Sequence, residues 1–216
     1  KRVLGSPQEI KEVKNAFETY DNLLTFNLYS EKDLLLAHQI LMSELVKDNG
    51  KFRNKSVGIS DGNRIIHIAP PSERVPFLIN DLLNWLEKSQ LNPLIKSCIF
   101  HYEFEFIHPF SDGNGRMGRL WQTLILADWK PLFAWLPVET IVKENQKEYY
   151  QALQSADNTG DSTIFIEFML RSILRAVEEL KKTQNVGANV GATVGVNEIS
   201  ILELITKNPK ITAKEI

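Results

Sequence analysis

Residues 108–119, HPFSDGNGRMGR, are the most informative part of the chain. Gly113 and Gly115 allow a tight turn and let a ligand approach the backbone. Asn114 is a good N-cap, so a helix is expected to begin after it. Because the amides at a helix N-terminus attract anions, this segment predicts a phosphate-binding loop at the start of a helix.

The charged residues of the same segment fit nucleotide chemistry. Arg116 and Arg119 are three residues apart, so both guanidinium groups lie on one face of the first helical turn, where they suit phosphate oxygens. Asp112 offers one hard oxygen ligand to a magnesium ion that bridges two phosphates. His108 titrates near neutrality and can take a proton from an attacking hydroxyl. Together they predict in-line attack on a nucleotide phosphate.

Each of these residues is also common in a structural role. A histidine before a proline often packs or caps, and glycines with asparagine often form only a turn. An aspartate is most often a turn residue. Two arginines at a helix start oppose the helix dipole, and this mild cost favours a functional reason for them. Only the joint pattern favours nucleotide chemistry over a plain turn.

Helical periodicity surrounds this segment on both sides. Ser6 caps a predicted helix that runs to about Leu24, and Ser30 caps another that Asn49-Gly50 ends. The remaining predicted helices cover residues 75–86, 93–107, 142–154 and 164–180, together with the one that begins after Asn114. The helix from Pro93 must stop near Ile107, because Pro109 disfavours helical geometry at His108. The sequence therefore predicts a mainly helical, all-α fold.

One short region has a different pattern. Residues 57–60 and 65–68 are β-branched runs that flank Asp61-Gly62-Asn63, a strong hairpin signal. The hairpin is expected to form a small exposed flap, beside which an extended target segment can add by main-chain hydrogen bonds. The residues of this predicted edge are Ile65, Ile66, His67 and Ile68. A hairpin that merely covers the core fits the sequence equally well.

Composition excludes several classes of protein. The 216 residues are 43% hydrophobic and 24% charged, which argues against a disordered or fibrous chain. The formal net charge of −2 provides no overall basic field for nucleic acid or an anionic membrane. The single cysteine, Cys98, cannot form an internal disulfide, and neither zinc spacing nor a membrane-length apolar run is present. We expect a cytoplasmic protein without a membrane partner. His38, His67 and His101 show no partner spacing and are expected at the surface or in packing.

The chain is predicted to have three parts. Residues 1–182 form the main helical domain, and residues 183–197 are a linker of repeated Gly, Val and Asn. Residues 198–216 contain two short helical patterns joined by a tight turn, which resemble the start of a helix-turn-helix or winged helix. Because the chain lacks an initiator Met and stops inside a helical pattern, we expect it to be part of a longer protein.

Residues 108–119 match every defining position of the Fic family motif His-Pro-Phe-x-(Asp/Glu)-Gly-Asn-Gly-x-x-(Gly)-Arg. The resemblance extends over roughly residues 6–181 and includes the hairpin and residues 148–153. It implies a mostly helical Fic fold and a protein adenylyltransferase. Such an enzyme transfers AMP from ATP to a Tyr, Ser or Thr hydroxyl of a target protein, with magnesium, and releases pyrophosphate.

The resemblance also implies a role for each motif position. His108 is similar to the general base, Asp112 to the magnesium ligand, and Phe110 to the apolar anchor of the loop. The phosphate-binding residues it implies are Gly113, Asn114 and Gly115 around the α- and β-phosphates, Arg116 at the β-phosphate and Arg119 at the γ-phosphate. The adenine side is less readable, and candidate residues there are Asn145, Tyr149 and Tyr150.

Members of this family also inhibit themselves through a glutamate in a Ser/Thr-x-x-x-Glu-Gly/Asn motif. The residues before the first predicted helix contain no such motif, and we expect the inhibitory helix to precede residue 1 in the native protein. Without that glutamate the reverse, AMP-removing reaction is in doubt. A homodimer and AMP transfer onto the chain itself stay open.

Other activities stay open too. Relatives resembling Doc transfer phosphate and have Lys where this chain has Gly115, which favours nucleotidyl transfer here. Transfer of UMP or phosphocholine is an alternative, because the motif reads phosphates and not the base. From a different class, the chain could be a DNA-binding regulator with a Fic-fold sensor domain, although DNA binding would need a longer C-terminal segment. A catalytically silent adaptor is disfavoured by the complete motif.

Overall fold

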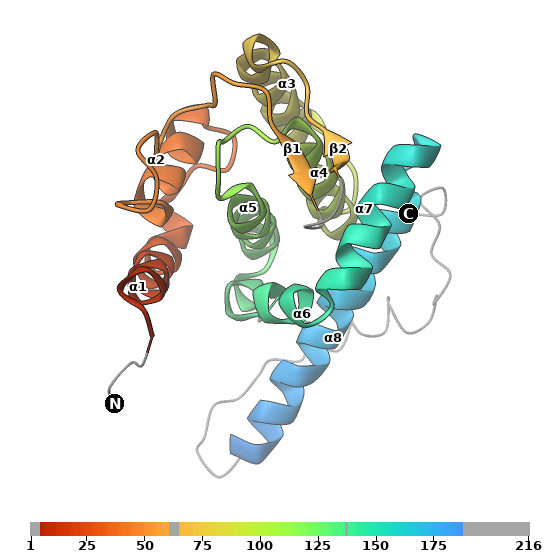
Figure 1. The fold of residues 1–216 in the computed structure, drawn as a ribbon. Coiled ribbons are helices and arrows are strands. Elements are labelled where there is room, and N and C mark those ends of the chain that lie inside the picture. The colour runs from red at the N-terminus through yellow and green to blue at the C-terminus, as the bar shows by residue number, and fades with distance from the viewer. Residues whose placement is uncertain (1–4, 61–64, 137, 188–216) are drawn as a thin grey trace. The chain divides into compact units, whose positions relative to one another are not determined.

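The computed structural model describes residues 5–60, 65–136 and 138–187. The chain divides into two compact units, Lys1–Ala134 and Trp135–Ile216. Figure 1 labels the α-helices and strands of both. The first unit contains α1 (Pro7–Asp21), η1 (Leu23–Thr25), α2 (Glu31–Leu41), β1 (Gly58–Ser60), β2 (Ile65–Ile68), η2 (Ser72–Arg74), α3 (Val75–Lys88), α4 (Pro93–Ile107) and α5 (Asn114–Trp129). The second unit contains α6 (Val138–Glu144), α7 (Gln146–Thr159) and α8 (Thr163–Gly187), and η3 (Pro131–Trp135) joins the two in sequence. The fold is mainly helical, as predicted. None of the helices in the described ranges combines the length and apolarity needed to cross a membrane.

The first two helices begin at the predicted caps. Ser6 and Glu9 form a complete capping box, and the Ser30 hydroxyl accepts the Asp33 amide. The second helix ends earlier than predicted, at Leu41 instead of before Asn49. The reason is that the Asn15 side chain donates to the carbonyl oxygens of Leu41 and Ser43, which satisfies them outside a helix.

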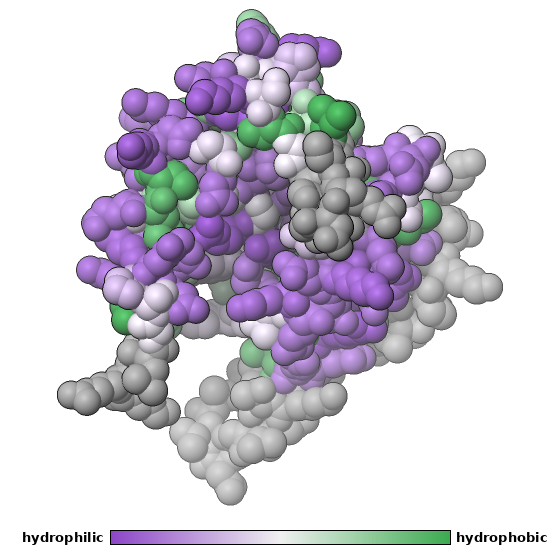
Figure 2. All heavy atoms as spheres, in the orientation of Figure 1, coloured by the Kyte–Doolittle hydropathy of each residue, from purple (hydrophilic) through white to green (hydrophobic). Residues whose placement is uncertain are grey.

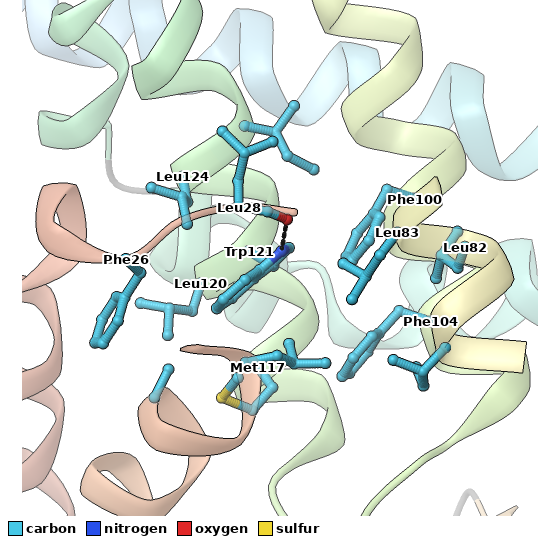
Figure 3. Packing of buried hydrophobic residues seen from close by; sticks show 14 of the residues in the cluster. Phe26, Leu28, Leu82, Leu83, Phe100, Phe104, Met117, Leu120, Trp121 and Leu124 are labelled. Atoms are coloured by element: carbon cyan, nitrogen blue, oxygen red, sulfur yellow. Dashed lines mark hydrogen bonds between the residues drawn. The ribbon is translucent and has the colours of Figure 1, made fainter. Parts of the chain in front are cut away.

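The core of the first unit lies around α5. This helix packs against α4 and η1, and its Trp121 is fully buried, with its indole N–H donating to Leu28 O at 3.0 Å (Figure 3). Phe100 and Phe104 of α4 are also fully buried and are stacked, with ring centroids 5.9 Å apart. Each side chain of this size contributes about 1.5–3 kcal/mol on burial, so the pair α4–α5 is the rigid base of the loop that joins them.

Little apolar surface is visible on the face shown in Figure 2. Hydrophobic residues there occupy small, separate areas among hydrophilic ones. Many of the buried apolar side chains of the first unit form one internal cluster, which draws members from η1, α2, α3, α4 and α5.

The hairpin region contains two short antiparallel strands. β1 and β2 pair with Gly58 opposite Ile68, Ile59 opposite His67 and Ser60 opposite Ile65, and the register shifts between Ile59 and Ser60. Ala69 N–H then donates to Val57 O at 3.2 Å. Ile68 is 76% exposed, so the end of β2 is open to solvent. The predicted turn at residues 61–63 lies outside the described residues.

In the second unit, the helix predicted over residues 142–154 proves to be two helices. α6 ends at Glu144 and α7 begins at Gln146, because Asn145 leaves helical geometry (φ −110°, ψ 31°) and its side chain donates to Ile141 O at 2.8 Å. The last helix extends to Gly187 and so includes the first five residues of the predicted linker. The rest of that linker and the predicted helix-turn-helix start at residues 198–216 lie outside the described residues.

Candidate active site

His108 lies at the C-terminal end of α4 in a left-handed conformation (φ 49°, ψ 61°). The helix ends at Ile107, as Pro109 predicted, and the His108 N–H still donates to Phe104 O at 2.9 Å. For a residue with a β-carbon this conformation costs about 1–2 kcal/mol, so other contacts must hold it.

A buried arginine, which sequence reasoning missed, supplies those contacts. The Arg53 Nε–H donates to His108 O at 2.7 Å, and its Nη2 donates to Ile107 O at 3.2 Å. The Arg53 backbone N–H also donates to Pro109 O at 2.9 Å. Three consecutive carbonyl groups at the start of the motif are thus bound by one residue.

The loop after His108 is closed by Asn114. The Phe110 N–H donates to Asn114 Oδ1 at 2.8 Å, and Asn114 Nδ2 donates to Phe110 O at 2.9 Å. The expectation that Asn114 caps the helix is therefore wrong. The N-cap is Gly113, in a left-handed conformation (φ 85°), and Asn114 is the first helical residue. The carboxamide cannot cap the helix because it is already engaged with both backbone groups of Phe110.

His38 supports the loop from α2, although the sequence placed it only at the surface or in packing. Its ring is fully buried and stacks on Phe110, with centroids 3.6 Å apart and planes 3° apart. Gly50 N–H donates to His38 Nδ1 at 2.9 Å, so the proton of the neutral ring is on Nε2, which donates to Asp112 O at 3.0 Å. Burial lowers the pKa of His38, against raising contributions from Asp112 and Asp48. Phe110 is fully buried, as its role of loop anchor requires.

Close packing leaves no room for a side chain at Gly113. A β-carbon there would lie 2.7 Å from Met42 Sδ. The end of α2 therefore presses directly on the start of α5, and only glycine satisfies both the space and the positive φ.

The start of α5 brings amides and guanidinium groups together. The first intrahelical bond joins Met117 N–H to Gly113 O at 2.9 Å, so the amides of residues 114–116 have no carbonyl one turn earlier. A β-carbon on Gly115 would lie 3.1 Å from Arg119 Nη1, which places the Arg119 guanidinium over this turn. Arg116 Nη2 lies 3.7 Å from Asp112 Oδ1. The arrangement concentrates positive potential where a helix N-terminus already attracts anions.

The imidazole of His108 has one buried nitrogen. Nδ1 is inaccessible to solvent and lies 3.8 Å from Glu105 Oε2, while Glu105 Oε1 lies 3.8 Å from His101 Nε2. His101 is fully buried, with Nδ1 2.7 Å from Gln122 Oε1, and burial lowers its pKa to about 3. His101 is thus neutral, and Glu105 is the acidic group placed between the two rings.

Asp112 is the candidate metal ligand. Its side chain is 62% exposed, and Oδ1 accepts the Gly113 N–H at 2.6 Å. Within the described ranges, no group of three or more His, Cys, Asp or Glu side chains could enclose a metal ion. One exposed carboxylate beside an anion site suits Mg²⁺, which keeps several waters and binds through substrate phosphates.

The other predicted site residues are less directly connected to this loop. The strand Ile65–Ile68 belongs to the same unit, and Arg53 binds the chain at both ends of its hairpin. Asn145, Tyr149 and Tyr150 belong to the second unit. There Asn145 Oδ1 accepts from Arg175 Nη1 at 3.2 Å, and Tyr149 is buried against the rings of Tyr150, Phe165 and Phe168.

The chain is similar in sequence and in overall fold to known proteins. A crystal structure of a Fic family protein from Desulfovibrio desulfuricans G20 superposes with a TM-score of 0.80 and 53% identity, covering 91% of this chain and 59% of that one. A protein adenylyltransferase Fic from Nematostella vectensis is 28% identical over 180 residues, which are 82% of this chain and 38% of the relative.

A probable protein adenylyltransferase from Aquifex aeolicus is 31% identical over 155 residues, 69% of this chain and 45% of the relative. The chain thus spans less than two thirds of each of these relatives. Residues 28–126, slightly less than half of the chain, match the family model described as Fic/DOC family, and this segment belongs to that family.

Proposed function

We propose that this chain is a protein adenylyltransferase that transfers AMP from ATP to a Tyr, Ser or Thr hydroxyl of a target protein. One observation carries the proposal. Within residues 108–119 a histidine, an exposed carboxylate, a helix N-terminus and two guanidinium groups lie on one loop and the first turns of α5. The relative from Nematostella vectensis, a protein adenylyltransferase, and the one from Aquifex aeolicus, a probable protein adenylyltransferase, support the same activity.

His108 is the proposed general base. Because its Nδ1 is buried, Nε2 is the ring nitrogen that takes the proton of the target hydroxyl. The hydroxyl oxygen then forms a bond to the α-phosphorus, and the bond from that phosphorus to the bridging oxygen of the β-phosphate breaks. Pyrophosphate leaves with the electron pair. Glu105, 3.8 Å from Nδ1, would stabilise the positive charge that the ring acquires.

The phosphates are held by backbone and guanidinium groups. Amides at the N-terminus of α5, in the segment Gly113, Asn114 and Gly115, would bind the α- and β-phosphate oxygens. Arg116 would contact the β-phosphate and Arg119 the γ-phosphate, with a planar fork each. Asp112 would hold Mg²⁺ together with the phosphates, and the ion when bound supplies neutralisation of charge on the departing pyrophosphate.

The hairpin is the proposed docking site for the target. β2 pairs with β1 in a two-stranded sheet, so an extended target segment can add along the other edge of Ile65–Ile68. Main-chain hydrogen bonds of this kind depend little on the side chains of the target segment. Specificity would therefore come from contacts with other parts of the target.

The proposal is tested with ATP labelled on the α-phosphate. The protein is incubated with Mg²⁺, labelled ATP and a cell lysate, and label is scored on lysate proteins and on the chain itself. Loss of a general base lowers rates by about 10²–10⁴-fold, so His108→Ala should reduce labelling by at least about 100-fold. Parallel reactions with ATP labelled on the γ-phosphate separate AMP transfer from phosphate transfer.

Three outcomes contradict the proposal. The first is undiminished labelling by His108→Ala. The second is label that comes from the γ-phosphate, or from α-labelled UTP, GTP or CTP in preference to ATP. The absence of any label from all four nucleotides would contradict nucleotidyl transfer as a whole.

A further inference from the structure

Arg53 is an extensively hydrogen-bonded side chain in the described part of the chain, and the proposed chemistry leaves it without a role. It is only 3% exposed, and its guanidinium donates four hydrogen bonds, all to backbone carbonyl oxygens. An arginine side chain has five N–H donors, so nearly its whole capacity is used. Burial lowers its pKa, and Glu73 opposes that change. A guanidinium stays charged at neutrality, and here carbonyl dipoles surround the charge.

The four carbonyl groups fall into two pairs. Ile107 and His108 provide one pair, at 3.2 and 2.7 Å, and these are carbonyls at the end of α4 that have no partner within the helix. A cation at this end also interacts favourably with the helix dipole. The other pair is Lys55 O at 2.8 Å and Pro70 O at 2.6 Å. Lys55 precedes β1 and Pro70 follows β2, so this pair marks the two ends of the hairpin.

We infer that Arg53 is a positioning residue that couples the target-binding hairpin to the general base. The inference rests on the function proposed above. One rigid guanidinium fixes the left-handed backbone of His108 and, at the same time, both ends of the hairpin. The distance from a hydroxyl docked at β2 to the imidazole is therefore set by this side chain.

The geometry requires arginine. Four acceptors around one planar group need donors that point in four fixed directions, and guanidinium supplies them. A lysine ammonium has three donors at a single point, which cannot reach both pairs of carbonyls. Arg53→Lys keeps the charge and removes the coupling, and it is the informative variant. Arg53→Gln removes both.

Steady-state kinetics test the coupling. A reactive group misplaced by about 1 Å costs about 100-fold in rate, so Arg53→Lys should lower kcat by about 10- to 100-fold. The KM for ATP should change less than about threefold, because the phosphates are bound by α5 and a residue that acts only on the reacting groups alters kcat. Arg74→Lys is the matched control, because Arg74 is an exposed arginine that follows the same hairpin in sequence. It should leave both constants unchanged.

Hydrogen exchange gives a second measurement that needs no activity. In Arg53→Lys the Ala69 amide, which donates to Val57, and the amide of residue 53, which donates to Pro109, should exchange faster. The amides of α3 and of α5 beyond its first turn should keep wild-type protection.

These two measurements separate the inference from the function on which it rests. A wild-type protein that transfers no AMP defeats the proposed function, whatever the exchange shows. If the wild type transfers AMP, a fully active Arg53→Lys variant overturns the inference. A rise in the KM for ATP as large as the fall in kcat overturns it too. Loss of protection throughout Lys1–Ala134 in both Arg53 variants also overturns it, because Arg53 would then serve folding and not positioning.

Discussion

Replacing His38 by phenylalanine should destabilise the first unit without changing the shape of its core. Phenylalanine retains the flat ring that stacks on Phe110 but has no nitrogen atoms. The Gly50 N–H and the Asp112 carbonyl each lose a partner, at 2.9 and 3.0 Å respectively. A buried group left without a partner costs about 1–3 kcal/mol. Both groups here are only partly buried, so the lower part of that range applies and the expected loss is about 2–4 kcal/mol.

Urea unfolding at neutral pH, followed by tryptophan fluorescence, measures this loss, because Trp121 is buried in the same unit. A loss of this size corresponds to a melting temperature lower by roughly 5–15 °C. Leu36→Ala is the control on the same helix, since Leu36 is partly exposed, and a change within about 0.5 kcal/mol is expected there. A His38→Phe variant that loses less than about 1 kcal/mol would refute the reasoning, because the two hydrogen bonds would then not be formed in solution.

Two further predictions concern backbone geometry and pH. Gly113→Ala should cost about 2–5 kcal/mol, since it adds the strain of a positive φ to an overlap with Met42. Gly160→Ala, at a positive φ with open space around it, should lose only about 1–2 kcal/mol, and equal losses for the two in urea unfolding would contradict this account. Because burial lowers the pKa of His101 from 6.5 to about 3, its contribution to stability is complete above pH 6.5 and is lost as the pH falls toward 3. The slope is up to about 1.4 kcal/mol per pH unit, so unfolding free energies measured from pH 7 to pH 5 should fall more steeply in the wild type than in His101→Asn. Parallel profiles would show that His101 is not buried in its neutral form.

The parts of the fold that depend on local chemistry were predictable. Pro109 fixes the end of α4 at Ile107, and the serine caps fix the starts of α1 and α2. The motif likewise predicted that the candidate site residues lie together at the start of a helix, because glycines, a carboxylate and two guanidinium groups within one short segment are typical of a phosphate-binding loop.

The supports of the loop were not predictable in the same way. Arg53 and His108 are 55 residues apart, and no local pattern links an arginine after Phe52 to a distant helix end. His38 did carry a signal. It stands four residues after Leu34 and three before Leu41, on the buried face of α2, where a polar residue needs a partner. The prediction for Asn114 was wrong because an asparagine side chain can either cap a helix or join two backbone groups of a loop. Only the folded structure decides between these two roles.

The pair of hydrogen bonds between Asn114 and Phe110 has a consequence for protein engineering. The two bonds close five consecutive residues into a ring, so the curvature of this loop is encoded within the loop itself. The rest of the protein supplies three contacts to this loop. The His38 imidazole stacks on Phe110 and donates to the Asp112 carbonyl, and the Arg53 guanidinium binds the end of the preceding helix. Residues 108–119 should therefore keep their conformation when they are grafted onto another protein. The host would need two consecutive helices and groups that make the same three contacts.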